Sequence, residues 1–235
     1  MTEGNDRGTF YVCGTPIGNL KDATFRLVET LTAADLVACE DTRRTLKLLS
    51  HFNLHKTVIS IYKHVERSRL ERILEALSQG KSVVYVSDAG MPCISDPGAY
   101  LVREVRQAGF SVVVIPGPSS VSAALTLSGF PADKFVFGGF VPRKGSQRRT
   151  FYSEWVKPEV TAAFFESPHR LAKSMADLAA IHPNASVCLC HEMTKVHESV
   201  LTGNASEIAE RLSGERVLGE WVVVVYLQKN QEEAG

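Results

Sequence analysis

Short runs of apolar residues, each four residues long, recur along the first half of the chain. They are Phe10–Cys13, Leu36–Cys39, Val58–Ile61, Val83–Val86 and Val112–Ile115. Stretches with helical periodicity separate most of them, as where Leu70, Ile73, Leu74 and Leu77 follow the i, i+3, i+4, i+7 spacing. Strands that alternate with helices predict a mainly parallel sheet covered on both faces.

The pattern changes after about Gly117. The stretch Phe130–Arg149 is rich in glycine and proline and predicts a linker with an exposed loop. The elements predicted after it are strand Ala162–Glu166, helix Arg170–Ile181, strand Val187–His191, and strands near Ser199–Leu201 and over Trp221–Leu227. We therefore expect an α/β protein of two domains, 9–117 and 118–228. The first would hold a mainly parallel sheet and the second a mixed sheet.

Loops that follow the strands are the candidates for chemistry, because ligands of open α/β sheets bind beyond the carboxyl ends of the strands. Gly14–Leu20 follows the first strand, and its glycines let the backbone approach a ligand. It matches neither G-x-G-x-x-G nor a P-loop, and a plain connecting turn is the alternative. Glu40–Arg43 follows the second strand. Its acidic residues could bind ribose hydroxyls, or Asp41 or Thr42 could cap a helix that begins near Arg43.

The loop Ser87–Gly98 follows the fourth run and holds two aspartates. Asp96 with Pro97 fits a helix N-cap followed by proline at the first helical position. Asp88 has no such role, and we interpret it as functional.

The loop Pro116–Ser120 follows the fifth run and precedes a predicted helix, Val121–Leu127. Ser119 and Ser120 could cap that helix with their hydroxyls. They could also offer hydroxyl and backbone N–H groups to a ligand, and the two roles are compatible.

Composition excludes several classes of function. Hydrophobic residues make up 44% and charged residues 22% of the chain, as in ordinary globular proteins. The first eight residues are polar, so we expect no secretory signal, and no apolar run is long enough to span a bilayer. The five cysteines include a C-x-C pair, Cys188 and Cys190, without the usual zinc spacing. We expect a cytoplasmic protein with reduced cysteines, no metal and no membrane partner.

Net charge limits how the chain can bind nucleic acid. The formal net charge is zero, whereas dedicated nucleic-acid binders are usually basic overall. Any RNA contact must therefore come from a local patch, and one short stretch holds Arg143, Lys144, Arg148 and Arg149. Lysine and arginine dominate phosphate binding, although such a run can also be a solvated face.

With these loops in order, the chain resembles the tetrapyrrole methylase superfamily, and most of all its branch that methylates small-subunit ribosomal RNA. In the first half the matching segments are Gly14–Leu20, Glu40–Arg43, Val86–Gly90, Ser95–Gly98 and Pro116–Pro118. In the second half they are Gly139-Phe140 with Pro142 and Lys144, Glu166-Ser167 with His169-Arg170, and Glu192 with Thr194-Lys195 and Glu198. The resemblance covers about Phe10 to Val225, and its ordered set of motifs is specific. Met91 departs from the branch, which usually has threonine there.

The resemblance implies a homodimer of two-domain subunits, with S-adenosylmethionine folded in the cleft between the domains. The reaction it implies is methyl transfer to the ribose 2′-hydroxyl of a cytidine in the decoding region of 16S rRNA, in the small ribosomal subunit. The expected cofactor contacts are Pro16, Ile17, Asp88, Gly90, Met91, Ile94, Ser119, Ser120, Phe165 and Glu166. The expected RNA contacts are Arg143, Lys144, Arg148 and Arg149.

Four side chains are candidates for catalysis: Asp41, Arg43, Glu192 and Lys195, which we expect to face the cleft. A ribose hydroxyl reacts once its proton is removed or its oxygen is held in line with the methyl. Asp41 could accept the proton if burial raises its pKa, and Lys195 if burial or a neighbouring cation lowers its pKa. Arg43 would hold a phosphate of the target nucleotide. An interdomain salt-bridge set without catalytic role is the alternative.

Other functions remain open from the sequence. A methyltransferase of the same fold could act on a corrinoid or porphyrinoid, although that class typically shows Gly-Asp-Pro where this chain has Gly90-Met-Pro92. A non-catalytic nucleoside-binding module is a further possibility. A dinucleotide oxidoreductase is disfavoured because its glycine fingerprint is missing.

Overall fold

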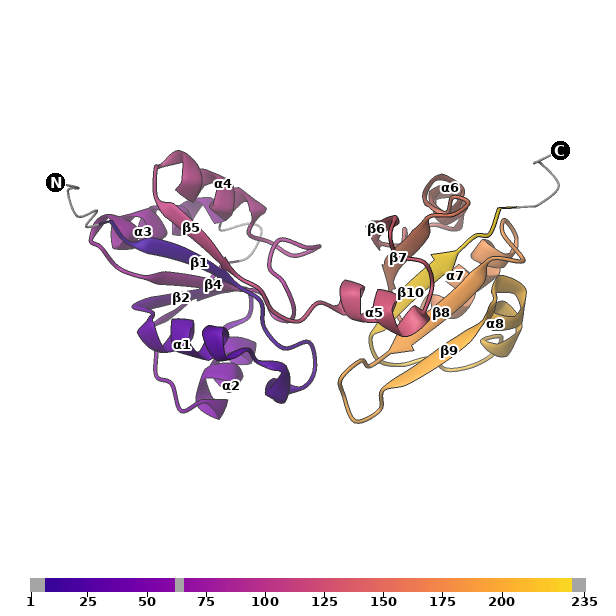
Figure 1. The fold of residues 1–235 in the computed structure, drawn as a ribbon, viewed down its shortest axis with the longest axis horizontal. Coiled ribbons are helices and arrows are strands. Elements are labelled where there is room, and N and C mark those ends of the chain that lie inside the picture. Colours follow the sequence, from indigo (N-terminus) through magenta and orange to yellow (C-terminus); the bar gives the residue numbers. More distant parts are fainter. Residues whose placement is uncertain (1–6, 62–65, 230–235) are drawn as a thin grey trace. The chain divides into compact units, whose positions relative to one another are not determined.

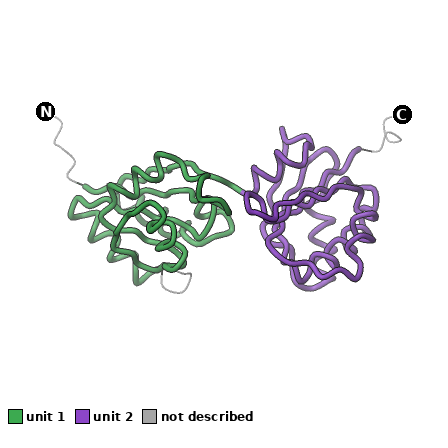
Figure 2. The backbone as a smooth tube through the Cα atoms, turned by 90° about the horizontal axis from the view of Figure 1, so that it is seen from below, with its two compact units in different colours: residues 1–119 green, residues 120–235 purple. Residues whose placement is uncertain are grey.

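The computed structural model describes residues 7–61 and 66–229, so the polar residues 1–6 noted above lie outside it. The chain forms two compact units, residues 1–119 (unit 1) and residues 120–235 (unit 2), shown in Figure 2. Each unit carries its own five-stranded sheet. Among the described residues, no helix is both long enough and apolar enough to cross a membrane.

Unit 1 alternates strands and helices, as the periodicity predicts. Its strands are β1 (Thr9–Cys13), β2 (Leu36–Cys39), β3 (Val58–Ser60), β4 (Val83–Val86) and β5 (Ser111–Ile115). Its helices are α1 (Phe25–Ala33), α2 (Thr42–His51), α3 (Glu66–Ser78) and α4 (Ala99–Gln107), with a 3-10 turn η1 at Leu20–Asp22. The strand order is β3-β2-β4-β1-β5 and neighbouring strands run parallel. The predicted parallel sheet is confirmed.

Helices cover both faces of this sheet, which explains why β2 and β4 are buried at every position. On one face α3 and α4 contribute buried Ile73, Leu77 and Leu101. On the other face α1 and α2 contribute buried Leu27 and Leu48. Figure 1 shows the two helix pairs on opposite sides of the strands. The strand ends that carry the candidate loops are thereby held by two separate apolar layers.

Unit 2 is built on a mixed sheet. Its strands are β6 (Phe135–Phe140), β7 (Thr161–Glu166), β8 (Ser186–His191), β9 (Ser199–Asn204) and β10 (Trp221–Tyr226). Its helices are α5 (Ser120–Ser128), α6 (Gly145–Trp155), α7 (Leu171–Ala179) and α8 (Ala205–Arg211). The strand order is β6-β7-β10-β8-β9, with β6 parallel to β7 and the remaining pairs antiparallel. The predicted mixed sheet is confirmed.

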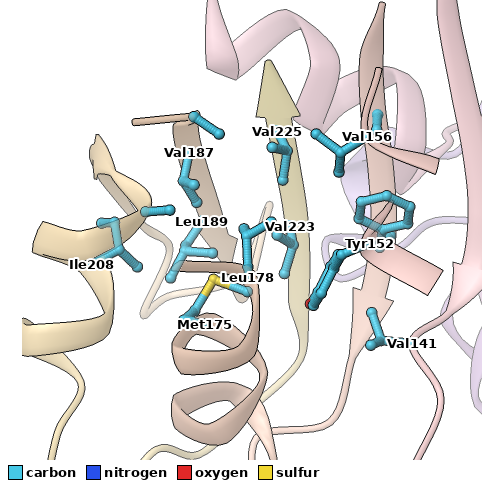
Figure 3. Packing of buried hydrophobic residues seen from close by; sticks show 14 of the residues in the cluster. Val141, Tyr152, Val156, Met175, Leu178, Val187, Leu189, Ile208, Val223 and Val225 are labelled. Atoms are coloured by element: carbon cyan, nitrogen blue, oxygen red, sulfur yellow. The ribbon is translucent and has the colours of Figure 1, made fainter. Parts of the chain in front are cut away.

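The main core of unit 2 lies on one face of this sheet. Met175 and Leu178 of α7 pack with Leu189 and Val223 of the strands and with Tyr152 of α6 (Figure 3). Helix α8 covers the same face through buried Ile208. Helix α5 packs on β10, β7 and β8 from the opposite face.

Two sequence expectations are wrong in the structure. Phe130–Arg149 is not a linker with an exposed loop, because it contains β6 and the start of α6. Gly138 and Gly139 form a bulge inside an edge strand. Judged by composition alone, adjacent glycines predict a loop at this point. Asp96 does not cap the following helix. Helix α4 begins at Ala99, and the residue before it, Gly98, has φ 117° with its backbone against the Tyr85 ring.

Candidate functional site

The loops that follow β1, β4 and β5 meet at the carboxyl edge of the unit 1 sheet. Thr15 and Gly90 exchange two backbone hydrogen bonds, from Thr15 N to Gly90 O at 2.9 Å and from Gly90 N to Thr15 O at 3.1 Å. Gly14 N donates to Ile115 O at 3.0 Å, which ties the first loop to the end of β5. Because all these strands are parallel, their loops emerge together, as expected for a ligand-binding edge.

Close backbone approach explains the glycines of this edge. A Cβ on Gly14 would lie 2.8 Å from the Gly117 backbone and 2.5 Å from Met91 Sδ. A Cβ on Gly117 would lie 2.7 Å from the Gly14 backbone, so neither Gly14 nor Gly117 has room for a side chain. Gly90 has φ 77°, and a Cβ there would lie 3.4 Å from Ile17 Cγ2 and 3.6 Å from Pro118 O. The structure therefore brings the cofactor candidates Ile17, Gly90 and Met91 together.

Asp88 connects the loop after β4 to the start of α2. Its carboxylate accepts a hydrogen bond from Asp41 N at 2.9 Å and lies 3.5 Å from Arg44 Nε. Asp41 in turn accepts from Arg43 N at 2.8 Å and is the N-cap of α2, so the capping interpretation of Asp41 is confirmed. Asp88 thus has a structural task that the sequence did not reveal. Its contact with a cofactor stays a prediction.

Two carboxyl groups beside Asp88 are not among the site residues expected from the sequence, although Glu40 belongs to a loop whose acidic residues could bind ribose. Burial raises the pKa of Glu40, and the charge of Asp88 raises it further. Burial also raises the pKa of Asp96, partly opposed by its hydrogen bond with Ser87 and reinforced by Asp88. Their positions in the sequence could have indicated them. Glu40 directly follows β2, and Asp96 lies in the loop after β4, which is the strand next to β2. Perturbed carboxyls at a strand edge are typical of functional sites.

A hollow of about 200 Å³ opens beside these loops. Its lining residues are Thr15, Pro16, Leu20, Arg44, Thr45, Lys47, Leu48, Ser87 and Asp88. Pro16 and Asp88 are cofactor candidates. Of the other candidates in unit 1, Ile94 is 48% exposed, and Ser119 is the last residue of the unit.

Neither Asp41 nor Lys195 has the pKa shift that would make it a general base. Asp41 is only partly buried, and the side-chain hydrogen bond from Arg43 lowers the pKa of its carboxyl to about 2. Burial lowers the pKa of Lys195, but its hydrogen bonds to Glu220 and Glu192, each 2.9 Å, outweigh burial and leave that pKa raised. A weakly basic carboxylate and a firmly protonated ammonium are poor proton acceptors at neutral pH.

Glu192 lies in an irregular turn after β8. It has φ 47°, and Thr194 has φ 65°, a conformation that non-glycine residues rarely adopt. The Glu192 carboxylate accepts from Lys195 and from Glu220 N at 2.8 Å, and the Lys195 bond is the main cause of its lowered pKa. Glu192 and Lys195 are therefore paired inside unit 2, and Asp41 and Arg43 are paired inside unit 1.

The remaining cofactor candidates, Ser120, Phe165 and Glu166, belong to unit 2. The Glu166 side chain is fully buried and accepts hydrogen bonds from Ser167 N and Ser174 Oγ, both at 2.6 Å. It also pairs with Arg170 at 2.7 Å. Its carboxylate is thus committed to anchoring β7 on α7, and a cofactor contact would use the backbone.

The basic stretch divides into exposed and buried members. Arg143, Lys144 and Arg149 are exposed, whereas Arg148 is 6% exposed. The Arg148 guanidinium donates to Asp177 Oδ2 through Nε at 2.7 Å and to Arg143 O at 3.1 Å. Arg148 therefore fixes the loop that carries Arg143, and it shares Asp177 with Arg149, which donates to Asp177 Oδ1 at 2.9 Å. We keep the three exposed cations as the predicted RNA contacts.

Comparison with known families gives one extended match. Residues 9–209 match the family described as Tetrapyrrole (Corrin/Porphyrin) Methylases. This range covers both sheets except for the last strand, β10.

Two relatives and one solved structure illustrate the similarity. The chain is 42% identical over 230 residues to Ribosomal RNA small subunit methyltransferase I of Neisseria meningitidis serogroup B, covering 97% of this chain and 79% of that protein. It is 42% identical over 218 residues to the protein of the same name from Thermotoga maritima, covering 93% and 98%. The crystal structure of uroporphyrin-III-C-methyltransferase from Thermus thermophilus superposes with a TM-score of 0.65 at 20% identity, covering 94% of each chain.

Proposed function

Because the chain belongs to the tetrapyrrole methylase family, we propose that it is an S-adenosylmethionine-dependent methyltransferase acting on ribosomal RNA of the small subunit. The cofactor follows from the family, and relatives at 42% identity are named for this RNA. The finer reaction that we propose is methyl transfer to the ribose 2′-hydroxyl of a cytidine in the decoding region of 16S rRNA. A cytoplasmic location and a homodimer complete the proposal.

The observation that carries the proposal is the carboxyl edge of unit 1. Its loops meet so closely that Gly14 has no room for a side chain. Three carboxyl groups, those of Glu40, Asp88 and Asp96, lie beside these loops. S-adenosylmethionine carries a positive sulfonium and an ammonium but no phosphate. Neighbouring carboxylates favour cations and would repel a phosphate. Arg44 and Lys47 also line the hollow, so it is the three carboxyls of the loops that suit this cofactor better than a nucleotide with a phosphate chain.

The proposed cofactor contacts draw on both units. From unit 1 they are Pro16, Ile17, Asp88, Gly90, Met91, Ile94 and Ser119, and from unit 2 they are Ser120, Phe165 and Glu166. When bound, S-adenosylmethionine supplies a methyl group on a cationic sulfur that is already an activated electrophile. The chain then has to hold the ribose oxygen in line with that methyl group. With Asp41 and Lys195 both poor bases, we propose that positioning provides most of the rate.

Methyl incorporation tests the function directly. The protein is incubated with radiolabelled S-adenosylmethionine and either small ribosomal subunits or a corrinoid intermediate, and labelled RNA is mapped by mass spectrometry. We expect label in 16S rRNA only, on the ribose of one cytidine. Label in the corrinoid would assign the chain to the other substrate class of its fold. Binding of the methyl donor without transfer to either acceptor would favour a nucleoside-binding module.

A further inference from the structure

A bulge in β6 turns Phe140 onto the same face of the sheet as Phe137. Phe137 pairs with Ala163 of β7 and Phe140 pairs with Phe165, so two residues, Gly138 and Gly139, stand opposite one. Gly139 has φ 67°, as expected for the glycine of such a bulge. Without the extra residue, side chains three positions apart would point to opposite faces. Bulges of this kind often re-aim a side chain beside a functional site.

The ring of Phe140 packs against the ring of Phe165. Its centroid lies 5.2 Å from that of Phe165, and Phe137 lies 4.9 Å from Phe165 on the same face. Val141 N donates to Phe165 O at 3.0 Å, which fixes the backbone next to the ring. Yet Phe140 remains 61% exposed. A phenylalanine held by its neighbours and still open to solvent can accept a flat partner at little entropic cost.

Two cations follow Phe140 closely along the chain. Arg143 and Lys144 follow within four residues and are both exposed. The Arg143 carbonyl is held by Arg148, whose guanidinium pairs with Asp177 near the end of α7. The loop that carries the cations is therefore tied to the same unit as the ring. An aromatic face combined with adjacent cations is the arrangement by which proteins bind single-stranded nucleic acid.

We propose that Phe140 is a stacking platform for an unpaired nucleobase of the RNA substrate, with Arg143 and Lys144 binding the flanking phosphates. The proposal deepens the proposed function and rests on it for the identity of the substrate. Stacking is sequence-tolerant, because every base has a π-face. Phe140 would therefore position the nucleotide or its neighbour and contribute little to the choice of base.

The test measures stacking without needing methyl transfer. The probe is a short single-stranded oligoribonucleotide that contains 2-aminopurine, whose fluorescence is quenched when the base stacks. The variants are Phe140→Leu, which removes the aromatic face, and Phe140→Trp, which keeps one. Phe135→Leu is the matched control, because Phe135 is 50% exposed at the other end of the same strand.

We expect Phe140→Leu to weaken binding of the oligoribonucleotide about tenfold or more and to abolish the quenching. Phe140→Trp and Phe135→Leu should bind as the unchanged protein does, and all variants should bind S-adenosylmethionine equally in calorimetry. Equal RNA binding by Phe140→Leu, or no binding by the unchanged protein, would overturn the proposal. So would a change in sedimentation for Phe140→Leu, since the ring would then face a second copy of the chain.

These outcomes are separate from those of the proposed function. If the unchanged protein quenches the probe but methylates no small-subunit RNA, the stacking platform stands and the substrate assignment fails. If it methylates that RNA while Phe140→Leu retains normal affinity and quenching, the function stands and the platform is wrong.

Discussion

Gly90 has a left-handed backbone in the middle of the proposed cofactor site. It has φ 77°, and a side chain there would be directed toward Ile17 Cγ2 and Pro118 O, both under 4 Å from its Cβ. We expect Gly90→Val to abolish S-adenosylmethionine binding measured by calorimetry. Gly214→Val is the control, because Gly214 has φ 79° with no atom within 4 Å of its Cβ position. Normal affinity in Gly90→Val would place the cofactor elsewhere.

The carboxyls beside Asp88 make a prediction about pH. Glu40 and Asp96 have raised pKa values, so each becomes neutral at a higher pH than an ordinary carboxyl, whose pKa is 4.5 for Glu and 3.8 for Asp. Loss of their negative charge weakens attraction for a cationic ligand. Affinity for S-adenosylmethionine should therefore fall as the pH drops through these raised values. The double variant Glu40→Gln, Asp96→Asn should show a flatter dependence in calorimetry, and an unchanged curve would remove both groups from the site.

Local residue roles were predictable where one segment contains both partners. The capping of α2 by Asp41 depends on a residue two positions away, and sequence alone proposed it. The bond from Asp41 N to Asp88 joins positions 47 residues apart and could not be read from either loop. The same holds for Arg148 and Arg149, which pair with Asp177 across 29 and 28 positions, and only burial distinguishes Arg148 from the exposed cations beside it. Long-range partners decided which polar residues are structural.

At the scale of elements, α7 is the clearest test of core packing. Leu178 is fully buried within the main core of unit 2. Leu178→Ala removes apolar contacts and leaves a cavity, so we expect the free energy of unfolding to fall by about 2–5 kcal/mol. Lys173→Ala on the exposed side of α7 should change it by about 0.5 kcal/mol or less. Denaturant titration measures both, and equal effects would contradict the packing.

The loop from β6 to α6 and the first turns of α6 carry the predicted phosphate contacts. Replacing Arg143, Lys144 and Arg149 together by glutamine should weaken binding to small subunits and flatten its dependence on salt, because fewer counterions are released. The control replaces three exposed cations of unit 1 instead, Arg67, Arg72 and Lys81, again by glutamine. Filter binding at several salt concentrations distinguishes the two sets. Identical salt slopes would make the stretch an ordinary solvated face.

Elements were predictable where periodicity was strong. The strands of unit 1 follow the apolar runs to within one residue at each end, most clearly β2 and β4, because strands buried on both faces are continuously apolar. The strand β6 was missed. It is an incompletely buried edge strand, and its two adjacent glycines interrupt the apolar run by which the other strands were predicted. The predicted N-cap at Asp96 was wrong for a different reason. A proline after aspartate is a common helix start, but here the chain continues through Gly98 before α4 begins.

At the scale of the whole molecule, alternation of strands and helices indicated the architecture but not the pairing. The parallel and mixed sheets follow from the class of fold, whereas the order β3-β2-β4-β1-β5 places β4 beside β1 through crossovers that the sequence does not encode locally. That order brings Thr15 against Gly90 and so assembles the candidate edge. The distribution of the candidate site residues over two units likewise follows from topology, since each unit folds around its own core.

The chemistry of methyl transfer is a property of the whole molecule, because its candidate groups lie in both units. If Asp41 or Lys195 were the general base, Asp41→Asn or Lys195→Met would lower turnover about 10²–10⁴-fold. The structure argues otherwise, since hydrogen bonds keep Asp41 ionised with a pKa of about 2 and keep Lys195 protonated. We therefore expect each variant to lose less than about tenfold in single-turnover rate. The pH profile of that rate should also keep its shape, because no titrating base is removed. A loss above about 100-fold in either variant, with cofactor and subunit binding intact, would identify that side chain as the base and show that substrate binding reverses its pKa.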